Sequence, residues 1–250
     1  MSGWLAIAGL GPGDDRLVTP EVTAALAEAT DVVGYIPYVA RVADRPGLVK
    51  HPSDNRVEID RSRLALSLAR QGRRVVVVSS GDPGVFAMAA AVFEALEAGP
   101  PDWRALDIRV LPGITAMLAA AARAGAPLGH DFCAINLSDN LKPWATVERR
   151  LRLSIEADFA IALYNPRSAS RPEGFERALD LLRETCEPTR VMIFARAVST
   201  PDESLRVIAL SEATSGMADM RTVVLVGSSA TRIIPREGRP LVYTPRSEPA

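Results

Sequence analysis

The sequence predicts an α/β protein made of two α/β domains. Short apolar strand-like runs alternate with helical segments along the chain, which is the pattern of α/β folds. The early runs, such as residues 75–78 (VVVV), are continuously apolar and β-branched, as in a buried parallel sheet. A Gly- and Pro-rich interruption at residues 125–129 divides the pattern. We therefore expect an N-terminal α/β domain over 1–124 and a C-terminal α/β domain with a mixed sheet over 125–250.

In the N-terminal half, helix signals separate the strand-like runs. Thr19 is a good N-cap and Pro20 suits the first helical position. Gly72 follows an amphipathic segment and is expected to end it. The expected strands are residues 5–8, 31–35, 75–78 and 107–111, and the expected helices are residues 20–29, 61–70, 85–98 and 116–124.

The C-terminal half begins in the same way but ends in strands that follow one another without long helices. Such successive strands pair antiparallel, so the second sheet is predicted to be mixed. The expected helices are residues 146–156 and 172–185, and the expected strands are residues 132–137, 159–164, 191–197, 204–210, 222–227 and 241–244.

Composition excludes several classes of protein. The chain has 250 residues and a formal net charge of −1, which argues against a general nucleic-acid binder. No run reaches the length of a membrane span and no signal peptide is recognisable, so no membrane partner is expected and the cytoplasm is the expected compartment. With two cysteines and two histidines, no metal site or iron–sulfur cluster is expected on this chain.

Two turns rich in Gly, Asp and Pro mark the expected ligand site. Residues 9–14 (GLGPGD) follow the first strand-like run, and residues 79–85 (SSGDPGV) follow the run at 75–78. Open α/β sheets bind ligands beyond the carboxyl ends of their strands, and glycine allows the backbone to approach a ligand closely.

The first turn does not match a dinucleotide-binding fingerprint. The third glycine of that motif is replaced by Asp14, and Pro12 lacks the N–H that a pyrophosphate would accept from. Residues 31–35 (DVVGY) also end without the acidic residue that holds a ribose. An acid at this position suits a ligand that carries no phosphate.

Three motifs in order resemble those of the tetrapyrrole methylases, S-adenosylmethionine-dependent enzymes of corrin and sirohaem synthesis. They are residues 9–14, 80–83 (SGDP) and 111–116 (LPGITA). Residues 34–38 (GYIPY) and 125–134 (GAPLGHDFCA) resemble the branch of the family that methylates carbon 17 of precorrin-3B. The resemblance extends from Trp4 to about Pro245.

The resemblance implies the class III methyltransferase fold, with a cleft between two α/β domains. The cofactor S-adenosyl-L-methionine, whose product is S-adenosyl-L-homocysteine, would lie in that cleft. The positions that match the family's cofactor-binding residues are Leu10, Pro12, Gly81, Asp82, Val85, Thr115, Ala116, Leu163, Tyr164 and Ala197.

The implied substrate, precorrin-3B, carries many carboxylates and would be methylated with ring contraction to precorrin-4. Arginine binds carboxylates bidentately, and the arginines near expected loop ends are Arg41, Arg45, Arg61, Arg63, Arg167, Arg171 and Arg232. The alternative interpretation, for most of these arginines, is a solvated side chain on the protein surface.

His130, beside Asp131, is the candidate acid–base group, with a purely structural histidine as the equal alternative. Tyr35 and Tyr38 are candidates to pack on or hydrogen-bond the macrocycle, with ordinary loop anchors as the alternative. The polar residues of 136–140 are expected to line the substrate side.

The resemblance also implies a homodimer and transient contacts with neighbouring enzymes of the pathway. Two other functions stay open: a sister methylase acting at another ring position or on a protein substrate such as a diphthamide precursor, and a non-catalytic tetrapyrrole carrier. The sequence leaves open whether the substrate is metal-free or holds cobalt.

Overall fold

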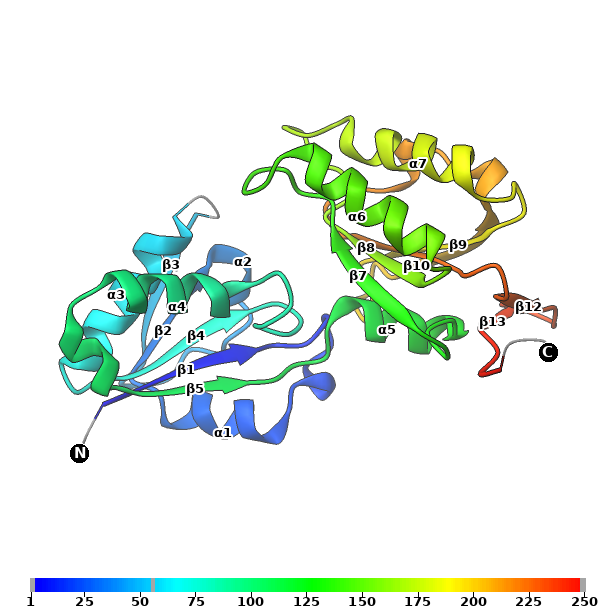
Figure 1. Ribbon diagram of the computed structural model, residues 1–250. Coiled ribbons are helices and arrows are strands. Elements are labelled where there is room, and N and C mark those ends of the chain that lie inside the picture. The colour runs from blue at the N-terminus through cyan, green and yellow to red at the C-terminus, as the bar shows by residue number, and fades with distance from the viewer. Residues whose placement is uncertain (1–2, 55–56, 248–250) are drawn as a thin grey trace. The chain divides into compact units, whose positions relative to one another are not determined.

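The computed structural model describes residues 3–54 and 57–247 and divides the chain into two compact units, 1–115 and 116–250 (Figure 1). The predicted boundary lay nine residues later, between 124 and 125. The helix α5 (Ala116–Ala124) groups with the second unit because it packs against strands β10 and β11 of that unit.

The first unit is built on a five-stranded sheet in which every pairing is parallel. The strand order is β3-β2-β4-β1-β5. The strands are β1 (Trp4–Gly9), β2 (Asp31–Tyr35), β3 (Val49–Ser53), β4 (Arg74–Ser79) and β5 (Asp107–Leu111). Because β1 lies between β4 and β5, the loops that leave these three strands begin side by side at one edge of the sheet.

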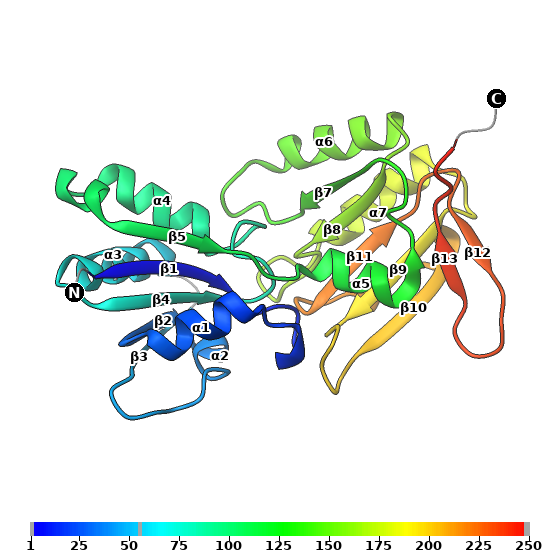
Figure 2. The ribbon, with the colours of Figure 1, turned by 90° about the horizontal axis from the view of Figure 1, so that it is seen from below.

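Helices cover both faces of this sheet (Figures 1 and 2). Leu5 and Ile7 of β1 pack in the core under α3 and α4, whereas Ala6 and Ala8 pack in the core that α1 and α2 share. This alternation is what a strand buried on both faces requires. The helices are α1 (Pro20–Glu28), α2 (Ile36–Val39), α3 (Glu58–Arg70) and α4 (Met88–Ala98), and the 3₁₀ segments are Asp15–Leu17 and Pro101–Ala105.

The second unit contains a mixed five-stranded sheet in the order β10-β9-β11-β8-β7, as predicted. Strands β7 and β8 pair parallel, and the other pairings are antiparallel. Helices α6 and α7 bury side chains such as Leu151 and Phe175 in one core against it. The strands and helices are β7 (Phe132–Asn136), α6 (Trp144–Glu156), β8 (Ala160–Tyr164), α7 (Gly174–Thr185), β9 (Val191–Arg196), β10 (Ser204–Ala209) and β11 (Thr222–Val226), and the 3₁₀ segments are Leu210–Glu212 and Ser215–Met217.

A small third sheet joins the two ends of the second unit. Strand β6 (Gly125–Ala126) pairs parallel with β13 (Leu241–Tyr243), which pairs antiparallel with β12 (Arg232–Ile234). Gly125 has a φ of +134°, and a side chain there would come within 2.5 Å of the Val242 carbonyl oxygen. The glycine-rich interruption expected to link the two halves is therefore part of a sheet inside the second unit.

Several element boundaries differ from the predicted ones for local reasons. Strand β3 was missed because its sequence, VKHPS, has no apolar run. Helix α4 begins at Met88 and not at residue 85, since Phe86 has a φ of +53° that no helix admits. Helix α7 begins at Gly174 and not at 172, and α3 begins at Glu58, three residues before the predicted start.

A buried carboxylate holds the amino end of the first sheet together. Asp31 is 1% exposed and accepts hydrogen bonds from Arg73 Nε at 2.7 Å, His51 Nε2 at 2.9 Å and Thr30 Oγ1 at 2.7 Å. Burial alone would raise the pKa of Asp31, but these hydrogen bonds outweigh it and lower the pKa below its ordinary value. The charged form therefore stabilises the folded state above the ordinary carboxyl pKa, and that contribution is lost as pH falls through the lowered pKa.

We predict that Asp31→Asn lowers the free energy of unfolding at pH 7 by about 1–3 kcal/mol, because buried donors lose a charged acceptor. Urea denaturation measures this. Asp44→Asn is the matched control, since the Asp44 carboxylate is exposed where it pairs with Lys50 and pairs at the surface contribute about 0–1 kcal/mol. The difference between wild type and Asp31→Asn should shrink in acid. Equal losses in the two variants would contradict the prediction.

Candidate functional site

Three loops meet at the carboxyl edge of the first sheet. The first loop (residues 9–14) follows β1, the second loop (80–86) follows β4, and the third loop (111–115) follows β5. The backbone N–H of Leu10 donates to the Ser79 carbonyl oxygen at 2.8 Å. Gly11 and Gly81 exchange two backbone hydrogen bonds of 2.9 and 3.1 Å, so the first two loops are joined directly.

Glycines bring the third loop into the same junction. A Cβ atom at Gly113 would lie 2.2 Å from the Gly81 carbonyl oxygen, and one at Gly9 would lie 2.5 Å from that atom. Both distances are far below any real contact, so no side chain fits at either position. The three loops therefore touch backbone to backbone, and glycine at 9 and 113 is a packing requirement.

The Asp82 carboxylate links the second loop to the third. Its Oδ1 accepts from the Gly84 N–H at 2.8 Å, and its Oδ2 accepts from the Gly113 N–H at 3.0 Å. The sequence placed Asp82 among cofactor-binding residues. The structure adds a role that sequence reasoning did not find, because the carboxylate holds the shape of the loops themselves.

Arg41, predicted as a candidate for substrate carboxylates, binds the first loop. Its guanidinium donates to the carbonyl oxygens of Leu10 at 2.6 Å, Gly13 at 3.1 Å and Gly11 at 3.3 Å, and it also lies 3.5 Å from an Asp15 carboxylate oxygen. Arg41 is therefore a positioning residue for the loop. Its distance in sequence from residues 9–14 hid this role.

The rest of the second loop is conformationally unusual. Phe86 has a φ of +53° and is 47% exposed, and it follows Val85, whose N–H donates to the Asp82 carbonyl oxygen at 3.3 Å. A positive φ is rare for residues with a Cβ atom and clusters at functional sites. Val85 is half-buried at this point.

Tyr35 and Tyr38 lie at the same edge of the first sheet, where Tyr35 ends β2 and Tyr38 belongs to α2. Their rings pack edge to face, with centroids 5.3 Å apart and an interplanar angle of 87°. Burial, followed by the influence of Tyr35, raises the pKa of the Tyr38 phenol above its ordinary value, so the hydroxyl stays a proton donor at neutral pH. A Cβ at Gly34 would come within 2.7 Å of Val78 Cγ2, which explains the glycine before this pair.

In the second unit, three residues predicted to bind the cofactor lie at one edge of the mixed sheet: Leu163, Tyr164 and Ala197. Strands β8 and β9 both pair antiparallel with β11, so their carboxyl ends lie at the same edge. The Tyr164 hydroxyl accepts the Met117 N–H at 3.0 Å, which brings the first turn of α5, begun by Ala116, to Tyr164.

Backbone strain marks this edge too. Ala197 is buried with a φ of +50°, and Asn165 has a φ of +51°. Asn165 also donates from Nδ2 to Asn136 Oδ1 at 3.1 Å, and the same oxygen accepts the Ser138 N–H at 2.9 Å. The polar loop that starts at residue 136 is thus tied to the loop after β8.

Burial limits how some predicted residues can touch a ligand. The side chains of Leu10 and Leu163 are 3% and 0% exposed and belong to the hydrophobic cores, while Thr115 is 5% exposed. Pro12 is half-buried and Gly81 is buried. The buried residues Leu10, Leu163 and Thr115 therefore support the loops of the site through the packing of their side chains.

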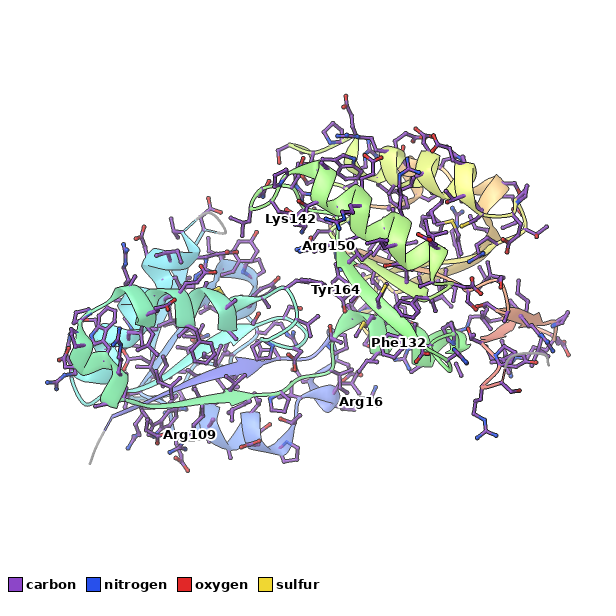
Figure 3. All side chains as sticks on the ribbon, viewed as in Figure 1. Arg16, Arg109, Phe132, Lys142, Arg150 and Tyr164 are labelled. Atoms are coloured by element: carbon purple, nitrogen blue, oxygen red, sulfur yellow. The ribbon has the colours of Figure 1, made fainter. Side chains whose placement is uncertain are left out.

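His130 lies at the other edge of the mixed sheet. It precedes Phe132, the first residue of β7, and register pairs Phe132 with Ala160 and Asn136 with Tyr164. Figure 3 shows Phe132 at the far end of β7 from Tyr164. The length of the strand separates His130 from Tyr164 by roughly 13–16 Å. His130 Nδ1 lies 3.9 Å from Asp131 Oδ2. His130 does not lie beside Leu163, Tyr164 or Ala197, the residues of this unit that were predicted to bind the cofactor.

The remaining candidate arginines divide by what they contact. Arg45 donates to the carbonyl oxygens of Leu26 and Ala29, and Arg61, which is 3% exposed, donates to Ser53 Oγ at 2.9 Å and the Asp54 carbonyl oxygen at 2.6 Å. These two have structural roles. Of the other four arginines, Arg63 and Arg232 are exposed at the surface, and Arg167 and Arg171 lie in the loop after β8.

Residues 3–54 and 57–247 offer neither a group of metal ligands nor a helix that could span a membrane. No group of three or more His, Cys, Asp or Glu side chains in these ranges is arranged to hold a metal ion. None of the helices in these ranges is long and apolar enough to span a bilayer.

Comparison with known proteins now identifies the family. The model for Tetrapyrrole (Corrin/Porphyrin) Methylases matches residues 5–214. The chain belongs to this family. A Sinorhizobium protein named Precorrin-3B C(17)-methyltransferase is 53% identical over 98% of this chain and 97% of its own length. The Mycobacterium bovis protein named Cobalamin biosynthesis protein CobIJ is 46% identical over all of this chain and 49% of its own length.

Solved structures agree with this assignment. A crystal structure of the methyltransferase CobJ is 68% identical, covers 98% of this chain and all of its own, and has a TM-score of 0.93. A Thermus thermophilus uroporphyrin-III C-methyltransferase complexed with S-adenyl homocysteine is 23% identical over 95% of this chain and 97% of its own, with a TM-score of 0.69, and shares the fold. This methylase is a methyltransferase with the predicted α/β fold.

We predict that His130→Gln keeps methyl transfer within about threefold of wild type, because the side chain lies at the other edge of the sheet from Tyr164. Initial rates measured with a methyl-labelled donor test this. A folded variant that loses about a hundredfold or more, the range of general acid–base catalysis, would restore His130 as an acid–base candidate.

Proposed function

We propose that the protein uses S-adenosyl-L-methionine to methylate precorrin-3B at carbon 17 in cobalamin biosynthesis. The observation that carries this proposal is the 53% identity, along nearly the whole of both chains, to a protein named Precorrin-3B C(17)-methyltransferase. Identity falls to 36% for a Salmonella typhimurium protein named Probable cobalt-factor III C(17)-methyltransferase. That difference supports a metal-free precorrin as the substrate.

The three-loop junction fits a donor without phosphate. The basic residues Arg41 and Arg16 both reach the first loop: Arg41 is turned toward its carbonyl oxygens, and Arg16 pairs with Asp14 at its end. The edge therefore offers backbone groups and apolar side chains such as Pro12 and Val85. An adenosine with a sulfonium centre suits such a site, whereas a pyrophosphate also calls for an unpaired basic group beside the backbone N–H groups.

We assign donor binding in the first unit to the three loops, through Leu10, Pro12, Gly81, Asp82, Val85 and Thr115. In the second unit we assign it to Ala116, Leu163, Tyr164 and Ala197. Bound S-adenosyl-L-methionine supplies an electrophilic methyl group, and S-adenosyl-L-homocysteine leaves with the electron pair of the broken C–S bond. The chain contributes by holding donor and acceptor carbon in line, an effect that can amount to about 7–11 kcal/mol.

Tyr35 and Tyr38 are proposed to face the macrocycle. They lie at the same sheet edge as the three loops, and an edge-to-face pair presents both an aromatic face and a hydroxyl. Ring contraction to precorrin-4, a homodimeric assembly, transient contacts with neighbouring pathway enzymes and a cytoplasmic location are carried over with the family resemblance and belong to the same proposal.

We predict that Arg41→Gln raises the dissociation constant for S-adenosyl-L-homocysteine by about tenfold, since the loss of charged hydrogen bonds worth about 1.4 kcal/mol frees the first loop. Isothermal titration calorimetry measures it. Arg63→Gln is the matched control because Arg63 is exposed and pairs with Asp60 on its own helix, at 3.6 Å. Unchanged affinity in a folded Arg41→Gln protein would refute the positioning role.

The function itself is tested by incubating the protein with methyl-labelled donor and precorrin-3B. We expect label at carbon 17, read by NMR of the product. Label at another carbon would indicate a sister methylase. Pigment that stays bound without label would indicate a carrier, and failure to bind S-adenosyl-L-homocysteine at millimolar concentration would refute the proposed donor.

A further inference from the structure

Three basic side chains of the second unit form a cluster, which we call the basic cluster: Lys142, Arg150 and Arg171. Lys142 lies in the loop after β7, Arg150 on α6, and Arg171 in the loop between β8 and α7. Figure 3 shows Lys142 and Arg150 on the same side of the unit as Tyr164. Burial, followed by repulsion from Arg150 and, more weakly, Arg171, lowers the pKa of Lys142.

The charges of the basic cluster are not neutralised by ion pairs. Within the described part of the chain no carboxylate lies within salt-bridge distance of Lys142, Arg150 or Arg171; Asp139 acts on Lys142 only from further away. By contrast, Arg152 on the same helix pairs with Glu148 at 3.1 Å and Glu184 at 3.5 Å.

Arg171 is also short of hydrogen-bond acceptors. Its Nε is buried without a partner among the described residues, its Nη1 lies 3.5 Å from the Asn165 carbonyl oxygen, and its Nη2 lies 3.8 Å from the Met220 sulfur. A buried guanidinium N–H without an acceptor is costly, and a carboxylate is the acceptor that its geometry matches.

The surroundings of the basic cluster are hollow and partly apolar. Met220, which Arg171 contacts, lines a cavity of about 480 Å³ together with Arg167, Ser168, Arg221 and Asp219. The Asp219 carboxylate is paired with Arg196 at 2.7 Å. Leu141, next to Lys142, is 94% exposed. Cations beside exposed apolar side chains and an open cavity suit a ligand with an apolar body and a carboxylate rim.

We propose that the basic cluster binds peripheral carboxylates of the tetrapyrrole substrate. This inference rests on the proposed function and adds to it the residues that recognise the acidic side chains. Arg150 and Arg171 offer bidentate donors, and Lys142, one of two lysines in the chain, offers a compact charge. The other lysine, Lys50, is already paired with Asp44.

The test uses the double variant Lys142→Gln/Arg150→Gln in the full-length protein. The probe is uroporphyrin, a stable polycarboxylic tetrapyrrole, and its binding is followed by quenching of its fluorescence at low and high salt. We expect the dissociation constant to rise about tenfold to a hundredfold, because hydrogen bonds to charged groups are lost. Its increase with salt should also become less steep.

Arg149→Gln is the matched control, because Arg149 is the neighbour of Arg150 on α6 but does not act on Lys142. It should bind uroporphyrin as wild type does. Fully esterified uroporphyrin should bind wild type and the double variant equally weakly, since it has no carboxylate to recognise.

Two results would overturn the inference: uroporphyrin affinity in the double variant equal to that of Arg149→Gln, or ester binding to wild type as tight as acid binding. Calorimetry with S-adenosyl-L-homocysteine separates this failure from failure of the proposed function. If S-adenosyl-L-homocysteine binds all variants equally and the substitutions leave the uroporphyrin affinity unchanged, only the role of the basic cluster is refuted. If wild type binds neither compound, the proposed function fails.

Discussion

The contact of three backbones at Gly9, Gly81 and Gly113 is the constraint on which the first unit's site depends. Side chains at 9 or 113 would overlap the Gly81 carbonyl oxygen, so the loops can meet only because these residues have none. The hydrogen bonds between Gly11 and Gly81, and from Gly113 to Asp82, then hold the meeting point in one conformation. Elements further away serve the same junction: Arg41, which follows α2, gathers three carbonyl oxygens of the first loop.

Both units have backbone with positive φ at the sheet edges where the candidate site residues lie. In the first unit glycines carry the positive φ angles where the first two loops meet, at Gly11 and Gly81, and Phe86 carries one further along the second loop. In the second unit Asn165 and Ala197 adopt positive φ in spite of their Cβ atoms. Strain of this kind costs about 1–3 kcal/mol per residue and persists only where the surroundings enforce it. The buried position of Ala197 and the bond between Asn165 and Asn136 are such surroundings.

Most of the fold could be predicted from the sequence because most strands of the two five-stranded sheets are apolar runs that end at turn residues. Strands 31–35 and 107–111 and helix 116–124 have the predicted bounds. It missed β3, whose residues are half-buried or exposed and include a proline, and α2, which Pro37 obscured. For the site, the glycine motifs mark the loops that meet backbone to backbone, and the binding of the methyl donor by these loops stays a prediction. Long-range contacts could not be predicted from the sequence. Two of them were therefore missed: the hydrogen bonds from Arg41 to the first loop, and the separation of His130 from Tyr164 by the length of β7.

The pairing of β6 with β13 ties residues 125–126 to residues 242–243, near the opposite end of the second unit's sequence. Thr244 reinforces this link, since its hydroxyl donates to the Pro127 carbonyl oxygen at 2.6 Å. During synthesis on the ribosome, the segment after α5 therefore waits for more than a hundred further residues before its partner strand emerges. The first unit completes its own sheet with β5, which ends at Leu111. Vectorial synthesis therefore favours an order in which the glycine junction is complete before the second unit acquires its last strand.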